Sequence, residues 1–519
     1  MTSNSKISDI VIFSDSRIDI NGMGSRSWGS YSIASHFRSI GFSTQVIDYI
    51  YNMNNEELEK AIKKYVSHST KIIGFGASFW EFFPNNIAHQ ISKIVKLIIE
   101  ISKNINPNIK VIAGGPSVRM FLREDFPKVD AIFEGFSESD STKFIEYIFK
   151  GGNLPKENSL VRDTLVYNNV TGGQGLFSTR RTSYIESDYI LEHEVPTLEI
   201  ARGCIFNCKF CSFALKGKKK LDYIKDQSVL RDELIENYEK YGMDKYIFVD
   251  DTFNDSQYKL DELYKTFSSL PFKMNFSAFL RLDLLNAHQD QIQQLQEMGL
   301  TSTFFGVETF HHKAAKEIGK GLHPDTTKEL LHQLTTKDWK NKVMVAITLL
   351  IGLPHETYES HEETLKWILD ENNLVNQVVP HLLMIQDPKT LIVPEKFPNV
   401  SKYQLESEKY GFYWEDRKDP FKWNNSIGPI SSREEAHQLY VRYLDAIRHS
   451  GRLTQGGFNL HRLWPLFKFH KPNLEYNDLL KMSRKEFNDL CMYVIEKDKA
   501  DPPLVNIYKK KILEDDQTL

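Results

Sequence analysis

Three of the four cysteines of this chain of 519 residues lie together in the stretch ARGCIFNCKFCSF. Cys204, Cys208 and Cys211 have the spacing Cys-x3-Cys-x2-Cys and follow Gly203, a residue type that lets the backbone turn sharply. Thiolates bind soft or borderline metals, chiefly zinc and iron–sulfur clusters. A cubane cluster has four irons and normally takes four cysteines, so three cysteines would leave one iron open. An open coordination position is typical of a catalytic metal site.

A structural zinc site is the main alternative for these cysteines. Such a site normally has a second pair of ligands at short spacing, and no second Cys-x2-Cys or nearby Cys-x2-His pair follows the loop. The fourth cysteine, Cys491, lies in FNDLCMYVIE, which has a helical pattern in which a small buried residue is expected. We therefore expect the three clustered cysteines to hold an iron–sulfur cluster and Cys491 to be a packing residue rather than a fourth ligand.

The segments that follow the cysteines alternate between strand-like and helical patterns. Runs of apolar and aromatic residues predict strands at 246–251, 273–281, 301–308 and 343–354, with amphipathic windows typical of helices between them. One strand–helix unit after another is typical of a parallel barrel or of part of one. We expect this barrel to occupy residues 195–385.

The N-terminal residues, 1–155, alternate in the same way and predict a doubly wound, Rossmann-like parallel sheet. In such sheets the ligand crevice lies outside the carboxyl ends of the strands. Glycines occur at these ends, in KIIGFGAS, KVIAGGPS and DAIFEG, so a flat ligand could approach the backbone closely. Its expected strands are 9–15, 44–49, 71–78, 110–117 and 130–135.

The remaining segments have weaker patterns. Residues 156–194 lose the regular alternation and contain the breaker TGGQG, so we expect an interdomain linker there. Residues 386–519 have mostly helical patterns and are expected to form a C-terminal helical domain. The end of the chain, YKKKILEDDQTL, is expected to be a solvated tail. The predicted fold class is therefore α/β with a mostly helical C-terminal region.

Composition limits the classes of partner. The 65 basic and 69 acidic residues nearly cancel, so no global field favours nucleic acid or an anionic membrane. The N-terminus lacks a basic region followed by a long apolar run, and no window of about 18 apolar residues occurs. We expect a cytoplasmic protein with reduced thiols, no membrane partner and no nucleic-acid partner.

The cysteine loop, with Phe210 just before its last cysteine, resembles the signature of the radical S-adenosylmethionine (SAM) enzymes. The segments FVDDTF, FLRLD, FFGVE and LLIGLPHET resemble later parts of that family in order, and together they span the length of its partial (β/α)6 barrel. The resemblance implies a [4Fe–4S] cluster whose open iron chelates SAM. An electron from an external one-electron reductant, such as a flavodoxin or ferredoxin, then cleaves SAM to methionine and a 5'-deoxyadenosyl radical.

The same resemblance implies roles for single residues around SAM. Phe210 would pack near the adenine. Asp250 and Asp251 fall where the family holds the methionine amino group, although the sequence here is Asp-Asp-Thr instead of Gly-Gly-Glu. A carboxylate there would meet an ammonium in a partly desolvated site. The sequence leaves open which aspartate makes this contact, and Asp250 could instead cap a helix.

Two further charged residues have implied roles of the same kind. Arg281 is a candidate for the methionine carboxylate, and Glu308 for the ribose hydroxyls or the amino group. Leu353 and Pro354 would supply backbone and apolar contacts to the adenine. The structural alternative is that Arg281 only forms an ion pair with Asp283.

The N-terminal sheet resembles the cobalamin-binding domain found upstream of many radical SAM enzymes. The matching pieces are SYSIASHFRSIGFSTQVIDY, KIIGFGASFW, VIAGGPSV and DAIFEGFSESDSTKFIEYI. The loop after the first strand, SDSRIDINGMG, has no histidine to bind cobalt, so a residue of the loop after the third strand would face the metal without binding it. The alternative is a vestigial scaffold with Trp80 in its core. The residues implied in cobalamin binding are Ser78, Phe79, Trp80, Gly114, Gly115, Gly135 and Glu138.

The two resemblances together imply methylation of an unactivated carbon. The deoxyadenosyl radical would take a hydrogen from a small metabolite, a natural-product intermediate or a peptide, and the substrate radical would attack methylcobalamin. An alternative is a radical rearrangement, cyclisation or epimerisation, which would not add a methylene to the product mass. A third reading is a non-enzymatic iron–sulfur protein for electron transfer or sensing. The sequence assigns no substrate and no catalytic residue.

Overall fold

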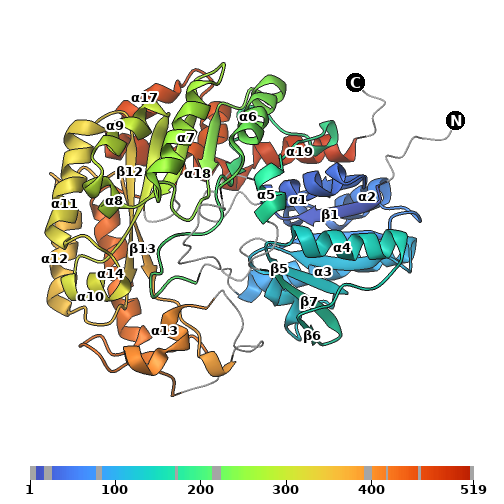
Figure 1. Ribbon diagram of the computed structural model, residues 1–519, viewed down its shortest axis with the longest axis horizontal. Coiled ribbons are helices and arrows are strands. Elements are labelled where there is room, and N and C mark those ends of the chain that lie inside the picture. Colours follow the sequence, from blue (N-terminus) through green and yellow to red (C-terminus); the bar gives the residue numbers. More distant parts are fainter. Residues whose placement is uncertain are drawn as a thin grey trace.

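The N-terminal domain is a parallel sheet with helices on both faces, shown in blue and cyan in Figure 1. The computed structural model describes residues 8–16, 26–77, 85–169, 174–212, 224–390, 400–415, 419–453 and 458–514. The strand order is β2-β1-β3-β4-β5-β7-β6. Its helices are α1 (Trp28–Ser39), α2 (Asn55–Tyr65), α3 (Asn85–Ile105) and α4 (Glu138–Lys150). Its strands are β1 (Ile10–Ser14), β2 (Thr44–Ile47), β3 (Ile72–Gly76), β4 (Lys110–Gly114), β5 (Ala131–Gly135), β6 (Ser159–Val161) and β7 (Thr164–Asn169).

This sheet confirms the predicted doubly wound fold and extends beyond the segment expected to form it. Strands β1 to β5 are apolar runs buried between the helices, which is why they read as continuous hydrophobic stretches. The strand order reverses at β1 and β3, where a ligand crevice is expected. Strand β7 pairs with β5 in parallel, and β6 returns antiparallel at the edge. Both lie within residues expected to be linker, because short edge strands carry little hydrophobic pattern.

The second sheet has six strands in the order β13-β12-β11-β10-β9-β8, all parallel and in chain order. Within the part of the chain that the structure describes, β8 and β13 are not paired, so the barrel is open. This agrees with the predicted partial barrel. The strands are β8 (Thr197–Leu198), β9 (Lys245–Phe248), β10 (Asn275–Leu280), β11 (Leu300–Glu308), β12 (Met344–Ile351) and β13 (Gln377–Leu382). Helices α6 (Gln227–Tyr241), α7 (Gln257–Ser268), α8 (Leu282–Ala287), α9 (Asp290–Glu297), α10 (His312–Ile318), α11 (Pro324–Gln333) and α12 (Tyr358–Leu369) connect them.

The C-terminal region is mostly helical, and part of it covers the amino end of the barrel, where Leu460 and Arg484 lie beside Met344 and Asn376. The ring of Phe458 packs 4.8 Å from Phe279 and 5.8 Å from Phe304, between centroids, inside the barrel. Cys491 is fully buried on α18, as expected of a packing residue. The elements are α13 (Lys402–Leu405), β14 (Phe412–Tyr413), β15 (Asn424–Asn425), α14 (Arg433–His449), α15 (Asn459–Arg462), α16 (Trp464–His470), α17 (Tyr476–Lys481), α18 (Arg484–Ala500) and α19 (Pro503–Leu513).

The end of the chain differs from the solvated tail expected from the sequence. Helix α19 packs against the N-terminal domain, where Val505, Tyr508 and Ile512 join the core formed by β1, β3 and α2 (Figure 1). The backbone N–H of Asp48 donates to the Tyr508 hydroxyl at 2.9 Å. The expectation was wrong because the lysine run at 509–511 masks apolar residues at helical spacing.

A buried arginine joins three parts of the chain. Arg26, before α1, donates from Nε and Nη2 to the carboxylate of Glu194 at 2.6 and 2.8 Å. It also donates to the Tyr31 hydroxyl and to the carbonyl of Tyr189. The Tyr508 ring lies 5.0 Å from its guanidinium carbon. The N-terminal domain, the segment that enters the barrel and helix α19 therefore meet at the Arg26 guanidinium.

No helix among the described residues is long and apolar enough to cross a membrane.

The docking of α19 predicts a stability effect at Tyr508. The change Tyr508→Ala removes a fully buried ring and the acceptor for the Asp48 N–H. We expect a loss of about 3–5 kcal/mol in the free energy of unfolding, which urea denaturation of the two proteins would measure. Ile507→Ala, on the partly exposed face of the same helix, should change it by about 0.5 kcal/mol or less. Equal effects of the two changes would contradict the docking of α19.

Candidate functional site

The three clustered cysteines line one cavity at the carboxyl end of the barrel strands. Cys204, Cys208 and Cys211 are half-buried and face a space of about 210 Å³. Gly203 precedes them with φ 88°, a left-handed conformation that glycine adopts without strain. Catalytic sites of parallel barrels lie at this end. The other lining residues are Phe206, Phe210, Asp251, Thr252, Phe279, Leu280, Arg281, Phe304, Gly306, Glu308, Lys320 and Thr348.

The cysteine sulfurs have polar contacts within this cavity. The backbone N–H of Phe206 donates to Cys204 Sγ at 3.4 Å, and Arg281 Nη1 donates to Cys208 Sγ at 3.5 Å. Burial raises the pKa of the Cys204 thiol, whereas a metal bound there would keep it deprotonated. No three His, Cys, Asp or Glu side chains in the described ranges converge closely enough to hold a single metal ion. Three thiols without a second pair of ligands fit an iron–sulfur cluster better than a closed structural zinc site.

The two aspartates after β9 have different positions. Asp250 Oδ1 accepts the backbone N–H groups of Ile200 and Ala201 at 2.8 and 3.0 Å, and it therefore holds the segment that leads into the cysteine loop. Asp251 lines the cavity. Burial, and then the charge of Asp250, raises the pKa of Asp251 to about 7. Of the two, Asp251 is the carboxylate that can meet a ligand, and Asp250 positions the loop.

Arg281 combines the two roles considered from the sequence. Its Nε and Nη2 donate to Asp283 at 2.9 and 2.5 Å, so the structural ion pair is formed. Its guanidinium also lines the cavity and lies 3.6 Å from the centroid of the Phe206 ring. The carboxylate of Asp283 therefore holds the Arg281 guanidinium in place, while its Nη1 faces Cys208.

Glu308, the last residue of β11, has a strained backbone. Its φ is 72°, in the left-handed region, which costs a residue with a side chain about 1–3 kcal/mol. Its carboxylate accepts a hydrogen bond from the Thr348 hydroxyl at 3.0 Å and lies 3.5 Å from Lys320 Nζ. A Cβ added at Gly306 would lie 2.6 Å from Glu308 Oε1. The strand end is thus shaped to turn this carboxylate into the cavity.

Three residues of the cavity were not singled out from the sequence. Thr252 lies within FVDDTF, Thr348 directly precedes LLIGLPHET, and only Lys320 of the three lies outside the segments quoted from the sequence. Lys320 reaches the cavity from the loop between α10 and α11, and its Nζ donates to the carbonyl of Gly306 at 2.6 Å. Leu353 and Pro354, by contrast, are buried after β12 and are not among the residues that line the cavity.

A second cavity, also about 210 Å³, lies at the carboxyl ends of the N-terminal strands. We call it the glycine-lined cavity, since Gly74, Gly76, Gly114, Gly115 and Gly135 form its wall together with residues of α1 and α4. A Cβ at Gly115 would lie 2.7 Å from the carbonyl oxygen of Ala77, so no larger residue fits there. Three predicted glycines thus meet at the predicted crevice. The predicted residues Ser78, Phe79 and Trp80 lie outside the described residues.

Glu138, which the resemblance implies in cobalamin binding, forms a buried ion pair. Arg202 Nη2 and Nη1 donate to its two carboxylate oxygens at 2.6 and 3.2 Å, and Arg180 pairs with the same carboxylate. Burial alone would raise the pKa of Glu138, but the charges of Arg180 and Arg202 outweigh it and hold the pKa at about 2. The carboxylate is therefore ionised and fully engaged by the two arginines.

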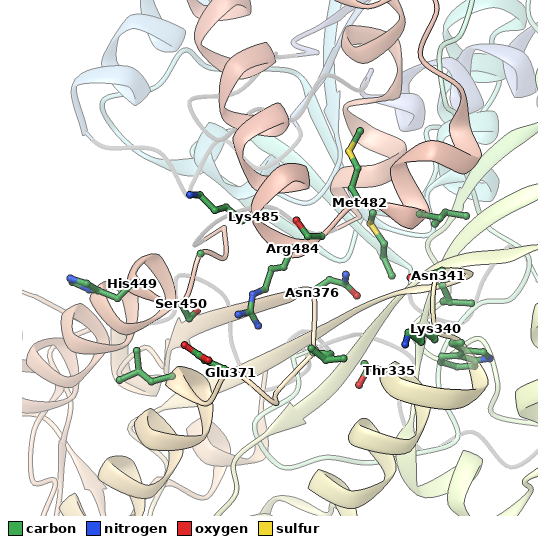
Figure 2. A pocket seen from close by; sticks show the side chains of 18 residues that line it. Thr335, Lys340, Asn341, Glu371, Asn376, His449, Ser450, Met482, Arg484 and Lys485 are labelled. Atoms are coloured by element: carbon green, nitrogen blue, oxygen red, sulfur yellow. The ribbon is translucent and has the colours of Figure 1, made fainter.

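A larger cavity, of about 580 Å³, lies at the opposite end of the barrel (Figure 2). Met344 begins β12 and Asn376 precedes β13, so this cavity lies at the amino ends of the strands. Arg484 and Glu371 project into it from α18 and from the loop after α12. It contains none of the cysteines, and the carboxyl-end cavity remains the candidate active site.

Comparison with known proteins gives a family match and several relatives. Residues 198–368 match the model of the radical SAM superfamily. The chain is 28% identical over 286 residues to the uncharacterised methyltransferase PH0819 of Pyrococcus horikoshii, covering 52% of this chain and 60% of the relative. It is 22% identical to the anaerobic magnesium-protoporphyrin IX monomethyl ester cyclase of Rubrivivax gelatinosus, and this match covers 68% of this chain and 63% of the relative. Each match spans less than two thirds of the relative.

Two solved structures share the fold over most of the chain. One is the radical SAM methyltransferase TsrM from Kitasatospora setae, determined with cobalamin and a [4Fe–4S] cluster; its TM-score is 0.65 at 12% identity, over 94% of this chain and all of TsrM. The other is the cobalamin-dependent SAM radical enzyme OxsB, with a TM-score of 0.58 at 12% identity, over 98% and 83%. At this identity the likeness shows the fold alone. Residues 198–368 therefore match the radical SAM superfamily, and the chain as a whole shares its fold with TsrM and OxsB.

Proposed function

We propose that this protein is a cobalamin-dependent radical SAM methyltransferase that acts on an unactivated carbon of a small molecule or peptide. The observation that carries the proposal is that one chain contains a cavity suited to an iron–sulfur cluster and a second cavity suited to cobalamin. One holds three cysteines at the mouth of the barrel, and the other is lined by glycines at the strand ends of the N-terminal sheet. Relatives named as methyltransferases and a shared fold with cobalamin-bound TsrM support it.

The residues of the barrel cavity fit a cluster and SAM. Cys204, Cys208 and Cys211 would hold the cluster. Asp251 would accept from the ammonium of SAM, and Glu308 would accept from its hydroxyl groups. When bound, the cluster supplies the electron that cleaves SAM, and cobalamin carries the methyl group. The electron would come from an external one-electron reductant such as a flavodoxin or ferredoxin.

The protein's own contribution is to orient the reactants and to exclude water. Phe279, Phe304 and Phe458 form an apolar floor beneath the cavity, because the first two line it and the third packs against both. A carbon-centred radical generated above this floor would be kept from solvent and from side reactions. The same floor favours a substrate with an apolar face.

A reaction without methyl transfer is the second candidate, because two relatives are named as cyclases. Product mass separates the two functions, because only methylation adds a methylene.

The test is anaerobic reconstitution with iron, sulfide and hydroxocobalamin, followed by dithionite and SAM. We expect S-adenosylhomocysteine together with 5'-deoxyadenosine, and a product heavier by one methylene once a substrate is supplied. Formation of 5'-deoxyadenosine without retained cobalamin or S-adenosylhomocysteine would instead favour the second function.

The cysteine assignment predicts a sharp difference between two cysteine variants. Cys208→Ala should abolish the visible absorbance of the cluster and all reductive cleavage of SAM, since one of three ligands is lost. Cys491→Ala should retain both, because this cysteine is buried in α18 away from the cavity. Absorbance spectra and 5'-deoxyadenosine assays of the two reconstituted proteins make the comparison. Cleavage by Cys208→Ala, or loss of the cluster in Cys491→Ala, would refute the assignment.

The raised pKa of Asp251 predicts that SAM binding depends on pH. A carboxyl with a pKa of about 7 is mostly protonated at pH 6 and mostly ionised at pH 8, so the affinity for the SAM ammonium should rise about tenfold over that interval. Asp251→Asn should bind SAM about 10- to 100-fold more weakly and lose this pH dependence. Anaerobic equilibrium dialysis with SAM measures both. An unchanged pH profile in Asp251→Asn would exclude this aspartate as the partner.

A further inference from the structure

The ion pair between Glu138 and Arg202 joins two segments that border different cavities. Glu138 is the first residue of α4 and directly follows Ser137, which lines the glycine-lined cavity together with Gly135. Arg202 lies two residues before Cys204 in the cysteine loop. Both oxygens of Glu138 accept from the two terminal nitrogens of Arg202, at 2.6 and 3.2 Å. One bidentate contact therefore connects the wall of the first cavity to the ligand loop of the second.

The surroundings of Arg202 hold its guanidinium in one orientation. Its side chain is 4% exposed, as is that of Glu138. The rings of Phe136 and Phe177 each lie 4.4 Å from its guanidinium carbon, and Nε donates to Glu199 at 2.9 Å. A planar guanidinium that binds a carboxylate through two hydrogen bonds and lies beside two aromatic rings can rotate little. These contacts hold Glu138 and the residue two positions before Cys204 in a fixed relation to each other.

We propose that Glu138 and Arg202 are positioning residues that couple the two cofactor sites, so that cobalamin in the glycine-lined cavity and the cluster on the cysteine loop each strengthen the binding of the other. The inference rests on the proposed function. Cobalamin packed against Gly135 and Ser137 fixes the start of α4, which fixes the loop before Cys204. Because coupling of two binding equilibria is reciprocal, cluster loading must raise cobalamin affinity by the same factor.

The purely structural role of such a pair is the alternative. A buried ion pair adds little net stability compared with an apolar pair of the same size, but it sets the relative position of its partners. Arg38 and Asp188 provide a comparison within this protein, since they form a similar bidentate pair at 2.7 and 2.8 Å. That pair joins α1 to the segment before β8, and neither residue lines the two cavities. Its loss should affect stability without affecting coupling.

The test measures the dissociation constant of hydroxocobalamin with and without the cluster. Anaerobic ultrafiltration, with unbound cobalamin read by absorbance in the filtrate, gives this constant for cluster-free and reconstituted protein. The wild type should bind cobalamin at least about fivefold more tightly after reconstitution, a ratio at the lower end of ordinary allosteric coupling. Glu138→Gln and Arg202→Met should bring the ratio close to one. Arg38→Met, the matched control, should keep the wild-type ratio.

The possible outcomes separate three claims: the proposed function, the coupling of the two sites, and the role of the ion pair in that coupling. A wild type that binds cobalamin with the same constant in both states overturns the coupling and leaves the proposed function intact. A wild type that binds no cobalamin overturns the proposed function, and the coupling with it. A wild-type ratio in Arg202→Met overturns the role of the ion pair. Should Arg202→Met fail to fold, Arg202→Lys replaces it, because lysine keeps the positive charge but cannot form the bidentate contact with Glu138. We expect an intermediate ratio for Arg202→Lys. A full wild-type ratio in this variant would refute the positioning role.

Discussion

The arrangement of the whole chain depends on the buried guanidinium of Arg26. It binds the carboxylate of Glu194 just before the first barrel strand, and the ring of Tyr508 from the last helix covers it. Three segments distant in sequence thus meet at one charge. Because an isolated buried charge is costly, loss of any one partner would destabilise the contact, and the interface has one favoured geometry. The Arg26 contacts and the shared apolar core together join the N-terminal sheet to the barrel.

A fixed interface matters because the proposed chemistry involves two cofactors. The cysteine loop lies at the carboxyl end of the barrel, and the glycine-lined cavity lies at the carboxyl ends of the other sheet. A reaction between groups held in separate domains requires that those domains keep a precise distance. Arg26 with Glu194 and Arg202 with Glu138 are both buried interdomain pairs, so charge rather than apolar contact alone sets that distance.

Within the barrel, polar and apolar surfaces are separated. Charged groups such as Asp251 and Glu308 line the cavity from the strand ends, while aromatic rings close it from below. The raised pKa of Asp251 reflects a carboxylate held away from water beside the charge of Asp250, whereas Glu308 faces the ammonium of Lys320 at 3.5 Å. A cationic ligand such as SAM would offset the cost of burying the charge of Asp251.

The sequence alone determined the features that depend on neighbouring residues. The cysteine loop is one local turn, and the strands are short contiguous runs of buried residues, so spacing predicted that the three cysteines lie together and periodicity predicted the two sheets and the partial barrel. The tertiary structure alone decided the rest. It separated Asp250 from Asp251, brought Lys320 and Thr348 to the cavity, paired Glu138 with Arg202 and docked α19 on the N-terminal domain. These contacts join residues far apart in the chain, and no local pattern of residue types specifies which distant partner a buried charge or an apolar helix face will meet.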